Sequence, residues 1–273
     1  MAHSAILKAN SSWLQRNAVA AFFVLAFLLS WYPWFIALSR GRTSGPNPLG
    51  PLVAAIILTA LTEGWTGLRA FFGRLLRWRV GVAWYLVVFL LPVAVCSVSA
   101  AITLAIIGSG SETLRLPAAQ EWSGLLDRFV FILLFIGLGE EPGWRGFALP
   151  HLQAKHSPLI ASLLLASVWT LWHLPLFGNE FPVLVVPAFV VSVFGATMLQ
   201  TWLFNRTDGS VLLQMILHAT VNTVGAGLVF PLFKGSALLV LWWIYSAVWL
   251  VLGGILLGRA HNQTVQTVRG HFD

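Results

Sequence analysis

Long apolar runs, separated by short polar segments, make up most of this chain of 273 residues. Hydrophobic residues account for 58% of the sequence and charged residues for only 9%. A soluble domain usually carries about 25% charged residues, so this chain cannot cover a water-facing surface. The runs lack the alternation of apolar and polar residues that is typical of a membrane β-barrel. We therefore predict an all-α fold, a polytopic membrane bundle of about eight transmembrane helices.

Eight segments fit as membrane spans. They cover residues 17–38, 49–62, 82–107, 124–150, 157–177, 182–204, 211–232 and 236–258. The second is short, so we expect it to be tilted, extended or partly re-entrant. The fourth is long, and Pro142 and Gly143 are expected to bend it. The first is too long for the apolar region of a signal peptide and lacks a cleavage site, so we expect it to remain as an anchor.

The basic residues explain the net charge of +7 without nucleic acid. They lie in the loops between spans, where they set membrane topology, and no basic face or binding motif accompanies them. With the N-terminus inside, eleven of the sixteen Lys and Arg residues fall in inner segments. We therefore expect both termini in the cytoplasm. The basic amphipathic segment 69–79 is expected to lie along the inner surface, against anionic membrane lipids.

Two acidic residues interrupt the fourth apolar run. Glu140 and Glu141 follow the sequence FVFILLFIGLG. Charges inside a membrane are costly and usually functional, and two adjacent carboxylates there need partners. Arg145 lies four residues after Glu141 on the same helical face. One interpretation is that these two side chains only neutralise each other's charge. Glu140 then points elsewhere.

Two histidines also lie deep in apolar spans. His173 shares a helical face with Trp169, and His218 shares one with Asn222, each at a spacing of four. Taken alone, either histidine or Asn222 is explained by a hydrogen bond to a neighbouring helix, and Trp169 by packing. From span boundaries we estimate depths of roughly 15, 24 and 11 Å for Glu140, His173 and His218. The three are therefore expected to come close together in the inner half of the bilayer.

Together these residues form three ordered motifs, each in a separate apolar span. The motifs are Glu140-Glu141-Pro-Gly-Trp-Arg145-Gly, Trp169-xxx-His173 and His218-xxx-Asn222. They resemble the signature motifs of the CPBP family, also called the CAAX protease and bacteriocin-processing family or ABI family. The resemblance covers about residues 122–227. One variation is Trp169, where members of that family often have Phe.

The resemblance implies hydrolysis of a peptide bond inside the membrane. Glu140 would activate water as the general base, and His173 would orient that water or share its proton. His218 and Asn222 would stabilise the developing oxyanion. Glu141 and Arg145 would set the electrostatic field of the pocket.

The sequence is also compatible with a metal-dependent mechanism of hydrolysis. Glu140, His173 and His218 form a ligand set of the catalytic zinc type, with one position left for water. We favour the metal-free glutamate mechanism, with a divalent metal such as zinc as the alternative. Other protease classes fit less well, because HExxH, a pair of intramembrane aspartates and a serine nucleophile elbow are all missing.

The interpretation divides the chain into three parts. Residues 1–121 hold transmembrane helices without motifs, 122–227 the catalytic core, and 228–273 the last helix and a tail. The expected substrate is a membrane-associated or lipidated peptide or protein, and the expected location is a bacterial cell membrane. One alternative is a non-catalytic membrane protein of the same fold in bacteriocin self-immunity, resistance or scaffolding. Another is a proton-coupled transporter, although inverted repeats are missing.

Overall fold

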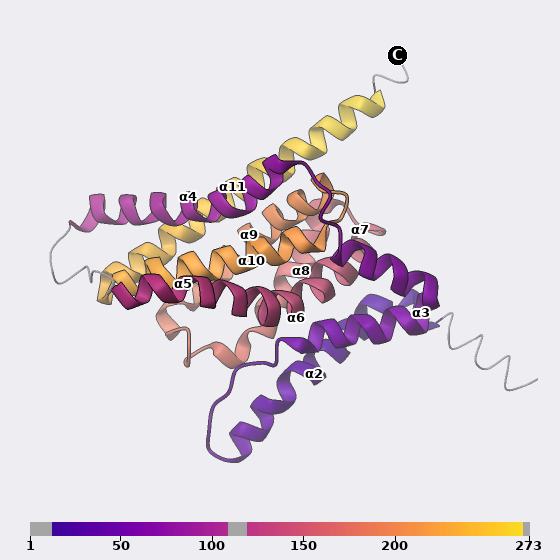
Figure 1. Ribbon diagram of the computed structural model, residues 1–273, viewed down its shortest axis with the longest axis horizontal. Helices are drawn as coiled ribbons and strands as arrows, with labels where there is room; N and C mark the ends of the chain where they lie inside the picture. The colour runs from indigo at the N-terminus through magenta and orange to yellow at the C-terminus, as the bar shows by residue number, and fades with distance from the viewer. Residues whose placement is uncertain (1–12, 109–118, 270–273) are drawn as a thin grey trace, which may run out of the picture.

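The computed structural model describes residues 13–108 and 119–269, with side chains from 13 to 108 and from 122 to 259. Within these ranges the chain is a helical bundle without strands (Figure 1). The main helices are α2 (Ala18–Ser39), α3 (Leu49–Leu75), α4 (Val82–Ile107), α8 (Pro158–Trp172), α9 (Val186–Arg206), α10 (Val211–Val224) and α11 (Gly235–Arg269). Seven described helical stretches are long and apolar enough to cross a membrane. The prediction of an all-α polytopic bundle is confirmed, and the protein is an integral multi-pass membrane protein.

The predicted fourth span is one continuous helical stretch of 32 residues from Trp122 to Gln153. It passes through α5 (Ala119–Phe131), a π-helix (η1, Ile132–Gly137), α6 (Leu138–Glu141), a second π-helix (η2, Pro142–Ala148) and α7 (Leu149–Gln153). π-Helical turns are rare and are frequent at functional sites. Here they flank the four-residue segment that carries both carboxylates. The expected change of geometry at Pro142 and Gly143 therefore takes the form of a π-helical segment.

The predicted fifth span is shorter than expected. Helix α8 has 15 residues, which gives about 22 Å at about 1.5 Å per residue, less than the roughly 30 Å of the hydrocarbon layer. Ser157 caps its start by accepting a hydrogen bond from the backbone N–H of Ile160 at 3.4 Å. Pro175 lacks the N–H that a longer helix would direct to the Leu171 carbonyl, and α8 ends at Trp172 with His173 at its C-terminal end. The estimate of about eight full spans becomes seven spans and one short helix.

The predicted second span extends past its expected end at residue 62. Helix α3 continues to Leu75 across a kink at Gly64, whose φ of 65° and ψ of −153° are open to glycine but not to other residues. The kink separates an apolar part from a second part that holds Arg69 and Arg74. The second part coincides with the segment that we expect along the inner surface, and that placement stays a prediction.

Two glycines of the acidic motif region set how closely α3 approaches the carboxylates. A Cβ atom on Gly139 would lie 2.4 Å from the Pro48 carbonyl oxygen. A Cβ atom on Gly143 would lie 2.5 Å from Pro51 and 2.6 Å from its carbonyl group. Small residues allow membrane helices to pack backbone against backbone. The start of α3 therefore packs directly on the turn that carries Glu140.

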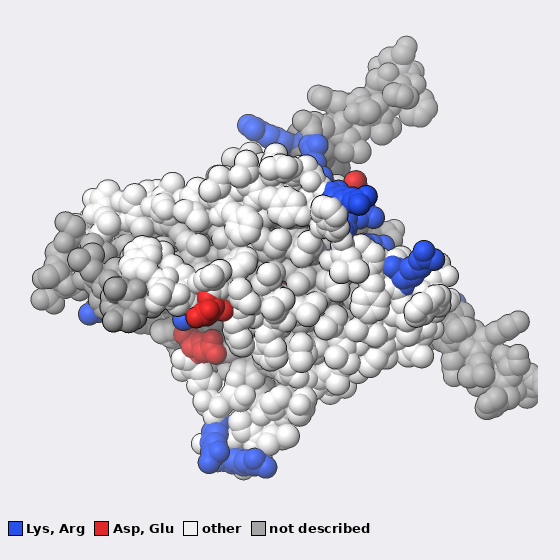
Figure 2. Space-filling view, viewed as in Figure 1, with Lys and Arg blue, Asp and Glu red and all other residues white. Residues whose placement is uncertain are grey.

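Charges on the surface gather at its margins. Figure 2 shows a face that is almost entirely uncharged across the middle of the bundle, with groups of Lys and Arg at its edges. A white central band is expected for helices in contact with lipid. The side of the membrane on which each terminus lies stays a prediction.

Candidate active site

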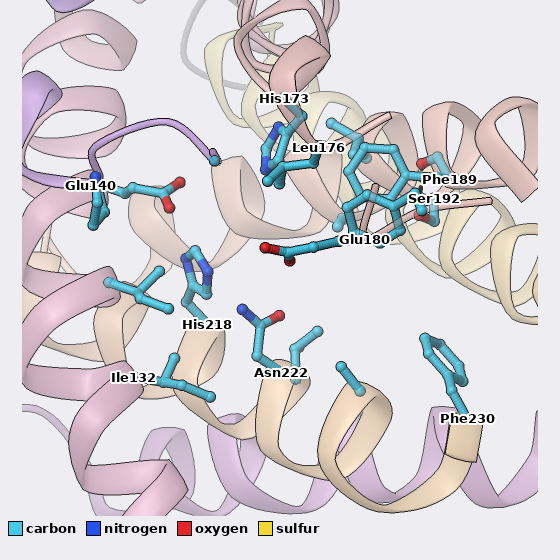
Figure 3. A pocket seen from close by; sticks show the side chains of 18 of the residues that line it. Ile132, Glu140, His173, Leu176, Glu180, Phe189, Ser192, His218, Asn222 and Phe230 are labelled. Atoms are coloured by element: carbon cyan, nitrogen blue, oxygen red, sulfur yellow. Dashed lines mark hydrogen bonds between the residues drawn. The ribbon is translucent and has the colours of Figure 1, made fainter. Parts of the chain in front are cut away.

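A cavity of about 1070 Å³ lies inside the bundle. Glu140, His173, His218 and Asn222 all line it, although they come from three separate segments of the chain (Figure 3). The structure thus brings Glu140, His173 and His218, which we expected to lie close together, and also Asn222, to one cavity. Glu141 and Arg145 are fully buried behind them and do not line the cavity.

Glu140 reaches the cavity from α6 while one of its oxygens is already held. Its Oε2 accepts a hydrogen bond of 3.0 Å from the indole Nε1 of Trp169. Only 4% of Glu140 is exposed. The indole therefore fixes the carboxylate and leaves Oε1 for another partner. Interpreting Trp169 as a packing residue alone was incomplete, because its ring nitrogen supports the proposed base.

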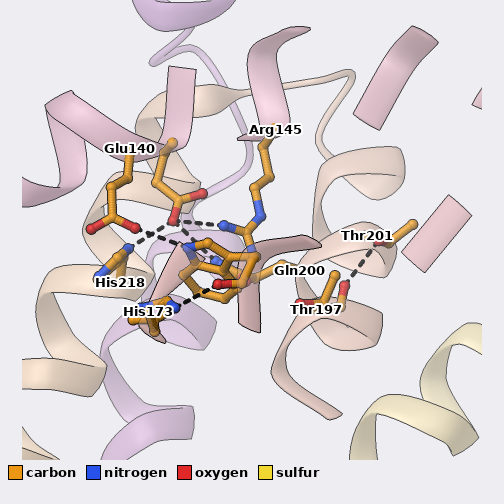
Figure 4. A network of polar contacts seen from close by, with 9 residues as sticks. Glu140, Arg145, His173, Thr197, Gln200, Thr201 and His218 are labelled. Atoms are coloured by element: carbon orange, nitrogen blue, oxygen red, sulfur yellow. Dashed lines mark hydrogen bonds and ion pairs between the residues drawn. The ribbon is translucent and has the colours of Figure 1, made fainter. Parts of the chain in front are cut away.

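His218 is positioned by Glu141 rather than by its own helix. Its Nδ1 lies 2.7 Å from Glu141 Oε1 (Figure 4). A carboxylate oxygen accepts, so Nδ1 carries the proton and donates. The other ring nitrogen, Nε2, is then the atom available to the cavity. An N–H held by a carboxylate in this way fixes the tautomer and the orientation of an imidazole.

The same oxygen of Glu141 is shared with a buried cation. Arg145 Nη1 donates to it at 3.1 Å, as the i,i+4 spacing predicts, and both side chains are fully buried. Arg145 also donates to Gln200 Oε1, and its guanidinium lies 4.1 Å from the centre of the Trp169 ring. Gln200 Nε2 lies 3.5 Å from Glu141 Oε1. The pair does more than neutralise itself, because it also supports His218.

His173 follows the last residue of α8, where the helix stops. Its Nδ1 lies 2.6 Å from the backbone oxygen of Trp169. A carbonyl oxygen accepts, so this nitrogen also donates and the other nitrogen is free to accept. Trp169 therefore connects the two elements, since it binds Glu140 through its side chain and His173 through its backbone.

Asn222 lies one helical turn after His218 on α10 and lines the same cavity. Its side-chain amide makes no hydrogen bond within the described part of the chain. The alternative that Asn222 joins two helices therefore finds no partner there. An amide that is free inside a cavity is available to donate to a ligand.

Sequence reasoning missed two polar residues of this region. Gln200 stands among apolar residues of the predicted sixth span, and a buried amide in a membrane span was a signal for it. Glu180 lies in a loop that the motifs do not include, and no pattern in the sequence indicated it. Residues outside 122–227 also line the cavity, among them Pro46, Pro48 and Trp242.

The suggested metal ligands do not form a recognisable metal site. In residues 13–108 and 122–259, no group of three or more His, Cys, Asp or Glu side chains is arranged to hold one ion. Nδ1 of both histidines is occupied by protein acceptors, which leaves Nε2 of each ring available, an arrangement that metal-binding histidines also show. The zinc alternative for Glu140, His173 and His218 therefore stays a prediction, and we derive no step through a metal.

Comparison with known proteins agrees with the motifs. A family model described as "Type II CAAX prenyl endopeptidase Rce1-like" matches residues 122–224. Residues 122–224 are therefore similar to this endopeptidase family. The chain is also 28% identical over 221 residues to "CAAX prenyl protease 2" of Methanococcus maripaludis. That match covers 74% of this chain and 81% of the relative. The match to the family model therefore coincides with the segment that carries all three motifs.

Proposed function

We propose that this protein is an intramembrane endopeptidase that hydrolyses a peptide bond of a membrane-associated or lipidated substrate with a water activated by Glu140. One observation carries the proposal: a general-base candidate, two histidines and a free amide line a single cavity inside a membrane bundle. The match to the type II CAAX prenyl endopeptidase model supports the same reaction class, as does the name of the relative, "CAAX prenyl protease 2".

The first step assigns the base. Glu140 takes a proton from a water molecule in the cavity, and the resulting hydroxide adds to the carbonyl carbon of the scissile bond. Trp169 holds one carboxylate oxygen, so the other faces the water. His173, with its Nδ1 proton held by a carbonyl, accepts from the water and orients it. The proton on Glu140 then passes to the leaving nitrogen as the C–N bond breaks.

The second step assigns the oxyanion partners. Addition of hydroxide turns the carbonyl oxygen into an anion, and donors already in place stabilise it. Asn222 offers its amide N–H groups, and His218 offers Nε2 when the imidazole is protonated. Glu141 stabilises that protonated form through Nδ1 at 2.7 Å. Arg145 in turn balances the charge of Glu141.

The remaining cavity wall suits an apolar substrate. Aromatic side chains line much of the rest of the cavity, among them Phe181, Phe230, Trp242 and Tyr245, and Phe189 lies next to His173 with the ring centres 5.2 Å apart. Pockets of about 300–1,000 Å³ hold drug-sized molecules, so this cavity has room for several residues or for a lipid chain. We also propose that the protein works in a bacterial cell membrane. The distribution of Lys and Arg favours an orientation with both termini in the cytoplasm.

The test compares wild type with Glu140→Gln, purified in detergent, on a panel of prenylated, acylated and unmodified peptides analysed by mass spectrometry. Gln keeps an acceptor for Trp169 and removes the base. Glu63→Gln is the matched control, because Glu63 is exposed and pairs only with His151 at 3.4 Å. We expect cleavage by wild type and by the control and a loss of about 10²–10⁴-fold in Glu140→Gln.

Parallel reactions with a chelator examine metal dependence. Cleavage that persists after chelation supports the glutamate mechanism, and cleavage that is lost and returns with zinc overturns it. Equal cleavage by Glu140→Gln and wild type would refute the assignment of the base. If a cellular phenotype such as bacteriocin resistance survives Glu140→Gln, the non-catalytic alternative gains support instead.

A further inference from the structure

One carboxylate in the cavity has no part in the chemistry described above. Glu180 lines the cavity, and Figure 3 shows its side chain directed toward the space beside His173, His218 and Asn222. Its carboxylate makes no hydrogen bond or ion pair with any residue that the structure describes. A charged group that faces a largely apolar cavity without a partner is available to a ligand.

The loop that carries Glu180 is held firmly in place. Gly178 has a φ of 82°, which lets the chain turn back on itself, and Phe177 and Phe181 pair across the turn. The rings of Phe177 and Phe181 lie 5.8 and 4.3 Å from that of Phe189 on α9. Aromatic contacts of this kind fix a loop on its helix. The direction of Glu180 is therefore set by the packing of the loop.

The charges along the cavity do not neutralise Glu180. Asp127, Glu140 and Glu180 supply three carboxylates, and Arg128 is the cation among the lining residues. The stem of Arg128 lies against Gly227, where a Cβ atom would be 2.6 Å from its Cδ. The lining thus holds more acidic than basic groups. Glu180 is exposed at the mouth of this cavity, and its carboxylate attracts a nearby cation and repels a nearby anion, an effect that weakens as salt is added.

We propose that Glu180 is a specificity-determining residue that favours substrates with Lys or Arg close to the scissile bond and disfavours those with Asp or Glu there. The inference rests on the proposed endopeptidase function, because it places the scissile bond beside His173, His218 and Asn222. Glu180 takes no part in proton transfer. It acts through the charge of the bound peptide.

The test uses three peptides that wild type cleaves and that differ only in one residue next to the cleaved bond, which is Lys, Gln or Glu. We expect wild type to cleave the Lys peptide about tenfold faster, in kcat/KM, than the Glu peptide, mostly through KM. Glu180→Gln should level the three rates, and Glu180→Lys should reverse their order. Asp127→Asn is the matched control, since Asp127 is an exposed lining residue, and it should leave the order unchanged.

The outcomes separate this inference from the proposed function. A purely structural role for Glu180 would lower all three rates by the same factor, which would overturn the inference while cleavage stands. If no peptide is cleaved, the inference is tested by binding instead. Fluorescently labelled forms of the three peptides are titrated against the Glu140→Gln variant. Tighter binding of the Lys peptide that disappears in Glu140→Gln/Glu180→Gln supports the inference, and equal binding of the three refutes it.

Discussion

The buried pair of Glu141 and Arg145 allows a quantitative prediction for the variant Glu141→Gln. The two side chains are joined at 3.1 Å and neither is exposed. Glu141 Oε1 also accepts from His218 Nδ1 at 2.7 Å. Gln has almost the same volume as Glu, so the substitution removes the charge and creates little empty space. The cation of Arg145 then stays in the bundle without its counter-ion.

The expected loss of stability follows from that unpaired charge. Removing one partner of a buried ion pair costs about 3–5 kcal/mol, because the remaining charge is desolvated and uncompensated. Two contacts of Arg145 survive, namely the hydrogen bond to Gln200 and the position over the Trp169 ring. We therefore expect a loss near the lower limit, about 3 kcal/mol of unfolding free energy.

A double-mutant cycle measures the interaction directly. The variants are Glu141→Gln, Arg145→Gln and the combination, and the measurement is equilibrium unfolding in mixed detergent micelles with increasing SDS. The double variant removes both charges of the pair, so neither is left buried without its partner. Its free energy of unfolding should therefore be at least that of the less stable of the two single variants. The coupling energy should exceed about 2 kcal/mol, within the range seen for residues of one network.

The control for this cycle is Glu63→Gln, which removes the exposed contact to His151. Exposed ion pairs contribute about 0–1 kcal/mol, so this variant should match wild type closely. If the losses of unfolding free energy of the two single variants add up to that of the double variant within about 0.5 kcal/mol, the two charges do not stabilise each other. That result would refute the electrostatic account of the site.

Three further predictions concern single positions. Trp169→Phe removes the indole donor to Glu140 but keeps a ring, so kcat should fall by about tenfold with unchanged unfolding, and an unchanged kcat would contradict this role. Asn222→Ala should lower kcat by about 10²–10³-fold at wild-type stability, and a loss confined to KM would argue against an oxyanion role. Gly143→Leu should unfold the protein or displace α3, because a Cβ there meets backbone at 2.6 Å, while Gly254→Leu, with open space around it, should be tolerated in thermal unfolding.

Much of the bundle was predictable because membrane spans depend on composition and length. The apolar runs predicted α2, α4, α9 and the start of α11 within a few residues, since lipid requires each span to satisfy its own backbone hydrogen bonds, while α11 continues eleven residues past the predicted end at 258. The length of α8 was not predictable from hydropathy alone. The apolar run continues through Leu174 to Phe177, and Pro175 was not a sufficient signal for an early end, because Pro33 and Pro92 lie inside α2 and α4 without ending them.

The site was predictable where its residues follow helical spacing. Arg145 pairs with Glu141 at i,i+4, and His218 and Asn222 share a cavity-facing side of α10 as expected. Contacts between segments did not follow from spacing. That Glu141 binds His218, and that Trp169 binds Glu140, depends on how α6, α8 and α10 pack, which one sequence does not specify.

The early end of α8 also explains how a hydrolytic site can lie inside an apolar bundle. A full-length helix would satisfy the Trp169 carbonyl with a backbone N–H, as its i→i+4 pattern requires. Because Pro175 and the turn at His173 stop the helix, that carbonyl accepts from the His173 ring at 2.6 Å instead. The same residue, Trp169, uses its indole to hold Glu140. The termination of one helix thus supplies the polar groups that a membrane interior otherwise lacks, and it places them beside the base.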